Sequence, residues 1–431
     1  MAPTGNGPES ELAAAIAAAS RHGIDRRGFL RLAGVAGGAV AGGSVLAACG
    51  VGAQKKAAPS GSALRKAAAG YWSDKKKTGH VNWAQWPLYI DVSDSNKSDH
   101  PSVDQFEKAT GIKVKYYEVI QDDPSFFAKV QPSLQSGQYT GYDLAVITNG
   151  IYFDKLRELG YLLPLDQSRL TNFKKYAGDS YRHTSYDPGN VYSVPWQSGI
   201  TGIAYDASKV SKPITSYFDL WDPSLKGKVG MFADNQDLPN AALVAMFGDP
   251  QKTGPAQWRK AADKLKQQRD KGIVRKYYEQ GYIDAISKGD IWASQAWSGD
   301  VFQALASGAK HLKFVIPKEG GVLWTDNMVL LKGAKNPVDA MMLMDFYYQP
   351  KIAAEVAEWV NYITPVPSAR QVVLSDARAA KGSDRASLQQ LANSPLVFPS
   401  QQDYAELHNY RTLTNAEEQT WNSIFQPIYQ S

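Results

Sequence analysis

Residues 103–117 read VDQFEKATGIKVKYY, and this stretch decides the fold class. Its first eight residues predict a helix, Gly111 ends that helix, and residues 113–117 predict a strand. Residues 81–83, VNW, predict another strand ahead of the helix. Strands that alternate with helices favour parallel sheets whose faces are covered by helices, so we expect an α/β fold.

The same alternation continues along the chain. Residues 142–147, YDLAVI, predict a strand, and residues 152–159 predict a helix that ends at Gly160. Residues 191–196 and 201–205 predict two consecutive extended segments with a glycine-containing joint between them. We expect the chain to pass from one lobe to another at this joint.

The composition is that of a globular protein. The chain has 431 residues, 43% of them apolar and 21% charged, and a formal net charge of +5. The length allows two or three domains, and the composition excludes a disordered chain, a polytopic membrane protein and a fibrous repeat. A single cysteine excludes a disulfide scaffold, a cysteine-based zinc site and an iron–sulfur cluster. The mild positive charge does not indicate nucleic-acid binding.

Residues 1–48 predict an export signal rather than part of the fold. Arg26 and Arg27 precede an uncharged run over residues 32–48 that is rich in alanine and glycine. A charged region followed by an apolar region and small residues is typical of secretory signals. The two adjacent arginines resemble the twin-arginine signal of bacteria.

The end of this segment predicts a lipid anchor. Residues 46–49, LAAC, resemble a bacterial lipobox, in which Cys49 is acylated and becomes the mature N-terminus. Residues 49–78 carry several lysines and show no helix or strand pattern, which predicts a flexible tether. We therefore expect an exported protein that is lipid-anchored to the outer face of the cell membrane. The alternative is a buried helix with a coincidental cysteine.

Sequence motifs of enzymes are missing. The six histidines include no His-Glu-x-x-His pattern, and we find neither a Gly-x-Ser-x-Gly elbow nor a phosphate-binding or dinucleotide-binding glycine loop after a predicted strand. These absences predict a protein without a metal or cofactor that is not an enzyme. An enzyme that uses scattered pairs of carboxylates, such as a glycosidase, stays open.

What remains is a set of tryptophans beside acidic residues. Trp324 and Asp326 lie two residues apart in the run PKEGGVLWTD, so an extended segment projects both from the same face. The other groups are Trp297 with Asp300, Trp83 with Trp86, and Asp234 with Asp237, three residues apart on one side of a helical turn. Aromatic faces attract an organic cation by about 0.5–2 kcal/mol each, and carboxylates neutralise its charge. Each residue also has a plainer alternative: a core tryptophan, a helix N-cap at Asp234 and a turn at Asp326.

From about residue 81 to residue 367, the order and spacing of these motifs resemble the spermidine/putrescine-binding proteins of ATP-driven importers. The most specific match is the run KEGGVLWTD at residues 318–326. The other matching stretches are residues 82–83 (NW), 106–114 (FEKATGIKV), 142–144 (YDL), 170–173 (LTNF), 297–300 (WSGD) and 362–365 (YITP). After residue 368 the resemblance is weak.

The resemblance implies a two-lobed, periplasmic-binding-protein-like (type II) α/β fold with a ligand cleft between the lobes. Lobe 1 would comprise residues 79–195 and 322–365, and lobe 2 residues 196–321 and 366–431. The implied ligand is a polyamine such as putrescine or spermidine, and the implied partners are the permease subunits of an ABC transporter. The resemblance implies a monomer that uses no cofactor and binds no nucleic acid.

Carried over residue by residue, the resemblance gives each candidate a role. Asp326, Asp234 and Asp237 would pair with ligand nitrogens, and Asp300 looks like the acid of putrescine-type members. The residues that would stack on the methylene chain are Trp83, Trp297, Trp324 and Tyr362, and Trp86 occupies a position that is usually tyrosine. Gln85 stands where an acidic residue is common, and residues 147–151, ITNGI, replace the usual Pro-Ser-x-Tyr. These two departures leave the length of the ligand open.

Two alternatives to a polyamine-binding protein remain. One is an exported carbohydrate-active enzyme that uses aspartate pairs and stacking tryptophans, and the other is a binding protein for another small solute such as a sugar. Sugar clefts usually add more Asn, Gln and Arg hydrogen-bonding groups than are visible in this sequence.

Overall fold

The computed structural model describes residues 70–93, 96 and 98–430. The chain divides into two units, Met1–Ala58 and Pro59–Ser431, and the fold described below belongs to the second unit. The predicted export signal at Arg26 and Arg27 and the predicted anchor at Cys49 lie outside the described residues.

The described residues build one mixed sheet in the strand order β2-β1-β3-β9-β4-β7-β5-β6, with β10 paired to β9 and β8 paired to β4. The strands are β1 His80–Gln85, β2 Lys113–Glu118, β3 Leu144–Thr148, β4 Ser193–Asp206, β5 Val229–Phe232, β6 Val274–Tyr278, β7 Ala293–Trp297, β8 Leu312–Val315, β9 Gly321–Leu330 and β10 Leu407–Asn409. β1, β2 and β3 are parallel to one another, and β5 is parallel to β6 and β7. The α/β fold expected from the sequence is confirmed.

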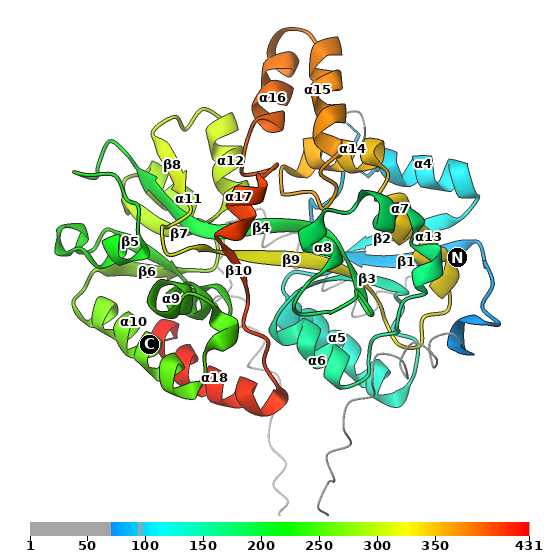
Figure 1. The fold of residues 1–431 in the computed structure, drawn as a ribbon, viewed down its shortest axis with the longest axis horizontal. Helices are drawn as coiled ribbons and strands as arrows, with labels where there is room; N and C mark the ends of the chain where they lie inside the picture. Colours follow the sequence, from blue (N-terminus) through cyan, green and yellow to red (C-terminus); the bar gives the residue numbers. More distant parts are fainter. Residues whose placement is uncertain (1–69, 94–95, 97, 431) are drawn as a thin grey trace, which may run out of the picture. The chain divides into compact units, whose positions relative to one another are not determined.

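Two long antiparallel strands join the two halves of this sheet (Figure 1). β9 pairs with β3 on one side, and β4 pairs with β7 and β8 on the other, while β4 and β9 pair with each other along most of their length. Every residue of both strands is buried. The register between them shifts at Pro195, which has no N–H to give to the ladder.

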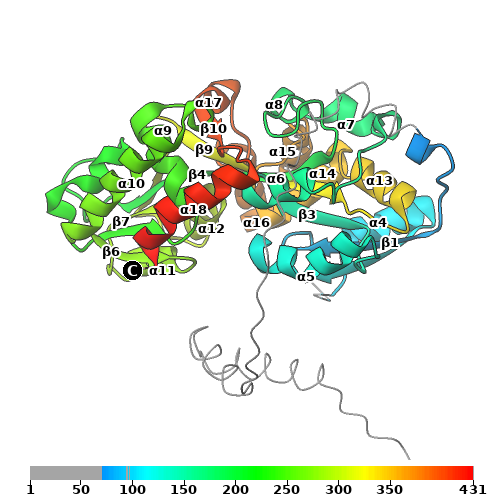
Figure 2. The same cartoon turned by 90° about the horizontal axis from the view of Figure 1, so that it is seen from below.

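Fifteen α-helices are present in the described part of the chain, and the helices cover the faces of the sheet (Figure 2). They are α4 Pro101–Thr110, α5 Asp123–Ser136, α6 Ile151–Glu158, α7 Thr171–Tyr176, α8 Asp179–Arg182, α9 Asp237–Phe247, α10 Pro255–Asp270, α11 Tyr282–Ser287, α12 Ser298–Ala306, α13 Pro337–Phe346, α14 Pro350–Val360, α15 Ala369–Ala379, α16 Gly382–Ala392, α17 Gln401–Ala405 and α18 Asn415–Tyr429. None of them is long and apolar enough to cross a bilayer.

The helix and strand predicted at residues 103–117 are confirmed, as α4 and β2. Gly111 ends α4 with φ of 70°, a left-handed conformation that glycine adopts without steric cost. The extended conformation predicted at residues 191–196 and 201–205 is confirmed from Ser193 onward, but the predicted joint between the two segments was wrong, because one continuous strand, β4, contains both. Gly199 lies inside that strand, and a Cβ there would come within 2.2 Å of Cζ2 of Trp324. This glycine therefore makes room for an indole ring rather than for a turn.

The hydrophobic side chains form separate cores at the two ends of the joining strands. The first core includes Trp83, Phe106 and Met341, and the second includes Leu243, Trp258 and Trp421. Helices α10 and α18 pack together beside the second core (Figure 2). The chain is thus arranged as two lobes that share β4 and β9.

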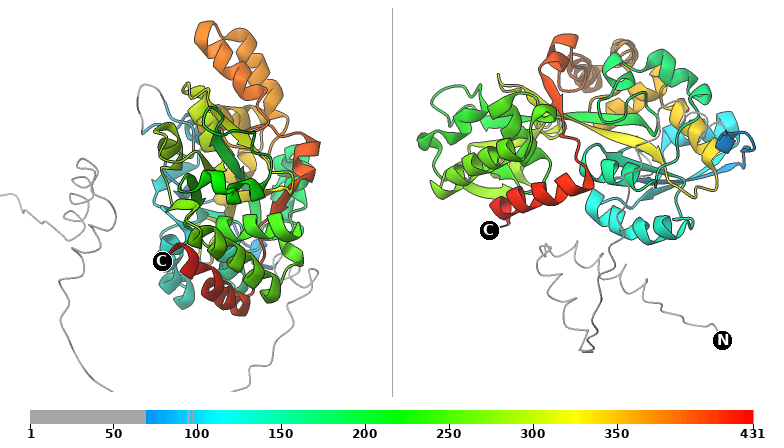
Figure 3. Two further views of the ribbon diagram at one scale, coloured as in Figure 1. Left: turned by 90° about the vertical axis from the view of Figure 1, so that its left-hand side faces the viewer. Right: turned by 60° about the horizontal axis from the view of Figure 1, so that its bottom comes forward.

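The predicted lobe boundaries stay a prediction, and one segment refines them. Residues 366–431 were expected in lobe 2, and α18 lies beside the core of that lobe. Helices α15 and α16 form a hairpin (Figure 3) that packs on α14, and Val366 and Val373 belong to the first core. We therefore expect the boundary between the lobes to fall within this segment rather than at its start.

Candidate functional site

Asp326 lies on β9 at the place where this strand passes alongside β3. Its register partner on β3 is Thr148, whose hydroxyl donates to Asp326 Oδ1 at 2.6 Å. The hydroxyl of Tyr89 donates to Asp326 Oδ2, also at 2.6 Å. Burial raises the pKa of Asp326 to about 6, and the hydrogen bonds from Thr148 and Tyr89 oppose this rise. The site thus holds a carboxyl group that is removed from water and bound only by neutral donors.

Trp324 projects two residues earlier on the same strand. Its ring lies 5.4 Å from the ring of Tyr362, which in turn lies 5.9 Å from the ring of Tyr89. Gly199 gives the indole room on β4. The indole Nε1 of Trp324 has no hydrogen-bond partner among the described residues. Three aromatic rings therefore gather beside Asp326.

Tyr362 links this group to a second carboxylate, Asp300, at the start of α12. The Tyr362 hydroxyl donates to Asp300 Oδ1 at 2.9 Å, and the Tyr282 hydroxyl donates to Asp300 Oδ2 at 2.6 Å. Burial raises the pKa of Asp300. A groove of about 360 Å³ lies next to this carboxylate and is lined by residues of α11 and α12, among them Tyr282, Asp300 and Gln303.

A third carboxylate, Asp237, lies at the start of α9. Its Oδ1 accepts hydrogen bonds from the hydroxyls of Thr201, at 2.5 Å, and Tyr410, at 2.8 Å. Its Oδ2 accepts one from Nε1 of Trp297 at 2.9 Å. The ring of Trp297 also stacks on Phe232, with a centroid distance of 4.6 Å and an interplanar angle of 24°.

Asp234 caps the same helix. Its Oδ1 accepts the backbone N–H groups of Gln236 at 2.7 Å and Asp237 at 2.6 Å. These are the bonds of an N-cap residue, the alternative role considered from the sequence. Burial, and then the charge of Asp237, raises the pKa of Asp234, and burial also raises the pKa of Asp237.

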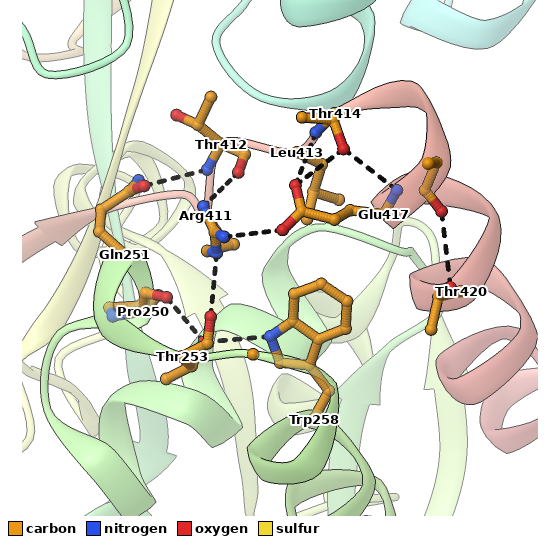
Figure 4. Close-up of polar contacts among 12 residues, drawn as sticks. Pro250, Gln251, Thr253, Trp258, Arg411, Thr412, Leu413, Thr414, Glu417 and Thr420 are labelled. Carbon is orange, nitrogen blue, oxygen red and sulfur yellow. Dashed lines mark hydrogen bonds and ion pairs between the residues drawn. The ribbon is translucent and has the colours of Figure 1, made fainter.

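Tyr410 reaches Asp237 from the segment between β10 and α18, which a polar network fastens to the second lobe (Figure 4). Arg411 donates to the backbone oxygen of Thr253 at 3.3 Å and to Glu417 Oε1 at 3.0 Å. Trp258 donates through Nε1 to the Thr253 hydroxyl at 3.1 Å. This network places a residue from the C-terminal part of the chain at the predicted site.

The structure connects seven of the nine predicted ligand-binding residues through hydrogen bonds and ring contacts: Asp326, Trp324, Tyr362, Asp300, Trp297, Asp237 and Asp234. Tyr89 links Asp326 to the ring of Tyr362, and Tyr282 links Asp300 to the backbone N–H of Trp297.

The other two predicted residues, Trp83 and Trp86, make no direct hydrogen bond or ring contact with these seven among the described residues. Trp83 is completely buried in the first core, with its ring 5.2 Å from that of Trp196 and 5.3 Å from that of Tyr116. Trp86 is half-buried and donates through Nε1 to the backbone oxygen of Val146 at 3.1 Å. Packing of this kind accounts for Trp83 without a ligand.

Sequence reasoning missed five residues that contact the predicted carboxylates: Tyr89, Thr148, Thr201, Tyr282 and Tyr410. Two of them had a nearby signal: Tyr89 follows the Trp83–Trp86 cluster by three residues, and Thr148 lies in the run ITNGI that departs from the family pattern. Tyr410 lies in the region where the family resemblance is weak. No group of three or more metal-binding side chains occurs within the described residues.

Comparisons with known proteins identify the family. A family model described as bacterial extracellular solute-binding protein matches residues 102–382. The spermidine/putrescine-binding periplasmic protein of Escherichia coli (strain K12) is 32% identical over 272 residues, which are 63% of this chain and 75% of that protein. The putrescine/agmatine-binding protein of Pseudomonas aeruginosa is 29% identical and covers 72% of this chain and 82% of its own length.

Solved structures show the same fold. The spermidine/putrescine ABC transporter substrate-binding protein PotD from Streptococcus pneumoniae matches with a TM-score of 0.67 at 23% identity, covering 82% of this chain and 99% of that chain. A putative spermidine/putrescine ABC transporter from Listeria monocytogenes matches with a TM-score of 0.65 at 26% identity, covering 81% and 99% of the two chains.

Proposed function

The chain belongs to the family of bacterial extracellular solute-binding proteins, and from this premise we propose that it captures a polyamine such as putrescine or spermidine. The captured polyamine is delivered to the permease subunits of an ABC transporter. In this proposal the protein acts as a monomer and carries out no catalysis. Relatives whose names state spermidine/putrescine and putrescine/agmatine binding support the choice of ligand.

The observation that carries the proposal is the sequence of contacts from Asp326 through Tyr89 and Tyr362 to Asp300, with the ring of Trp324 beside that of Tyr362. A polyamine is an apolar chain with ammonium groups, so its site needs aromatic surface between separated carboxylates. Each aromatic face attracts an ammonium by about 0.5–2 kcal/mol, and a carboxylate neutralises its charge. A neutral sugar can use the aromatic surface and donate hydrogen bonds to the carboxylates, but it leaves their buried negative charge uncompensated.

Calorimetry on the soluble part, residues 70–431, tests the ligand. We expect saturable binding of putrescine or spermidine at pH 7.5, and no binding of glucose or maltose. Asp74→Asn, a charge change in the segment ahead of β1, serves as the control and should bind like the parent. Absence of heat with every polyamine, or binding of a sugar, would overturn the proposal.

Scattering tests how the two lobes respond. A ligand held between lobes that share two strands shifts a hinge only by binding the closed form better. Small-angle scattering should therefore give a smaller radius of gyration with saturating ligand than without it. An unchanged radius would contradict ligand-induced closure.

We also propose that the protein is exported by its twin-arginine signal and anchored through acylated Cys49. Cys49→Ala should leave an exported protein that is no longer retained in the membrane fraction, because the chain has no other thiol. Replacing Arg26 and Arg27 together by lysine should block export. A Cys49→Ala protein that stays with the membrane after a salt wash would contradict the anchor.

A further inference from the structure

A further carboxylate, Asp123, lies near Asp326 and takes no part in the contacts described above. It is the first residue of α5 and is only 6% exposed. Its Oδ1 has no hydrogen-bond partner among the described residues. A buried carboxylate oxygen without a donor is costly to maintain, so it needs an explanation.

The sheet brings this carboxylate to Asp326. The backbone N–H groups of Val119 and Ile120 donate to the carbonyl oxygen of Gln85, which holds the segment before α5 against the end of β1. β1 and β3 are parallel, so their carboxyl ends meet at the same edge of the sheet. Thr148 ends β3 there and donates its hydroxyl to Asp326, and both Thr148 and Asp326 lie close enough to Asp123 to act on the pKa of its carboxyl.

The start of α5 does not need Asp123 as its cap. Asp122 already fills that place, because its Oδ1 accepts the backbone N–H of Ser125 at 2.7 Å and its Oδ2 accepts the Ser125 hydroxyl at 2.9 Å. Burial, and then the charge of Asp326, raises the pKa of Asp123 well above its ordinary value. Two ionised carboxylates beside one threonine repel each other, and either a proton on one of them or a cation beside both relieves the repulsion.

We propose that Asp123 is a second counter-charge for the ammonium group that Asp326 binds, so that this end of the site selects a fully charged amine over a neutral hydroxyl or amide. The inference rests on the proposed function. A primary ammonium suits the pair because its three N–H donors can reach oxygens of both carboxylates. Asp123 then supplies the charge that Gln85, buried at the end of β1, does not.

The test is titration calorimetry with putrescine and with spermidine at pH 7.5 on the parent, Asp123→Asn and Asp122→Asn. Both variants remove one charge from the same end of α5, and asparagine remains a good cap at position 122. We expect Asp123→Asn to weaken binding at least tenfold and Asp122→Asn to stay within twofold of the parent. Asp123→Ser, which also suits the start of a helix, should reproduce the loss.

Thermal unfolding without ligand separates a binding role from a structural one. We expect Asp123→Asn to unfold at the same or a higher temperature than the parent, because it removes an unpaired buried charge. Parent-like affinity in both variants of Asp123, or a loss of affinity that comes with an equal loss of thermal stability, would overturn the inference. If the parent binds polyamines and Asp326→Asn weakens that binding while Asp123→Asn does not, only this inference fails. If the parent binds no polyamine, the proposed function fails.

Discussion

Asp326 and Asp237 are both buried, both close to an aromatic ring, and surrounded in different ways. Asp237, in the second lobe, accepts hydrogen bonds from two hydroxyls and an indole N–H. Asp326, in the first lobe, accepts hydrogen bonds from two hydroxyls and lies near the carboxyl of Asp123, whose Oδ1 has no hydrogen-bond partner among the described residues. Asp237 also has an acidic neighbour, Asp234, but that carboxylate accepts two backbone N–H groups, whereas Asp123 keeps an oxygen without a donor. The difference teaches that adjacent carboxylates held by neutral donors can serve the fold alone, whereas a pair with an unpaired oxygen calls for a cation.

The matched substitutions Asp326→Asn and Asp237→Asn give the largest expected contrast. We expect Asp326→Asn to lose about 2–5 kcal/mol of polyamine binding, because a desolvated ammonium would be left without its partner. Asp237→Asn should instead lower the free energy of unfolding by about 1–3 kcal/mol, since an amide nitrogen would face one of its three donors. Calorimetry and chemical denaturation measure the two quantities. Equal losses of affinity in the two variants would remove the contrast.

Trp324 tests how much the aromatic surface of the site contributes to polyamine binding. It supplies aromatic surface between Asp326 and Tyr362, so Trp324→Ala should weaken polyamine binding by about 2–4 kcal/mol. Trp324→Phe keeps an aromatic face and should recover part of this loss. Calorimetry with putrescine checks both variants. Parent-like binding by Trp324→Ala would show that the ring is only packing against Gly199.

The sequence alone was sufficient to predict the fold class and to select part of the candidate site, because both depend on short-range patterns. The helix stop at Gly111 and the two-residue spacing of Trp324 and Asp326 depend on local geometry. The alternation of strands with helices likewise predicts an α/β fold before any long-range contact is known.

The remaining site residues could not be predicted, because long-range contacts place them. Thr148 and Tyr89 reach Asp326 across 178 and 237 residues of sequence, and Tyr410 reaches Asp237 across 173. Trp83 resembled a ligand-stacking residue, yet rings from distant segments enclose it in the core. Asp123 carries no signal of its own in the sequence, and only the packing of the start of α5 at the sheet edge brings it near Asp326.

The hydroxyl groups that donate to Asp326 and to Asp237 allow a finer comparison of these two carboxylates. Tyr89→Phe removes one of the two donors of Asp326, and Tyr410→Phe removes one of the three donors of Asp237. A single hydrogen bond contributes about 0.5–1.5 kcal/mol. We expect Tyr89→Phe to lower polyamine affinity by that amount, and Tyr410→Phe to lower the free energy of unfolding by a similar amount while affinity stays within twofold. The reverse assignment would contradict the comparison.

The smallest effect is the response to pH, and its sign separates binding from folding. Burial raises the pKa of Asp326 to about 6, above its ordinary value of about 3.9, so the native state takes up a proton that the unfolded chain does not bind between these pH values. Protonation of Asp326 therefore raises the free energy of unfolding of the unliganded protein as the pH falls from about 6 to about 3.9. A cationic ligand needs the ionised carboxyl, so affinity should fall about twofold between pH 7.5 and pH 6, and about tenfold by pH 5.

Calorimetry at these three pH values checks the prediction, with Asp326→Asn as the reference. Protonation of Asp123, whose pKa is also raised by burial and by Asp326, acts in the same direction as protonation of Asp326. In the Asp326→Asn variant the contribution of Asp326 is gone, so the ratio of parent to variant affinity should shrink as the pH falls. Asp237→Asn leaves Asp326 and Asp123 in place and should keep most of the pH dependence of the parent. A ratio that is constant from pH 7.5 to pH 5 would mean that ligand binding is not coupled to deprotonation of Asp326. The contrast between Asp326 and Asp237 would then depend on their hydrogen bonds alone.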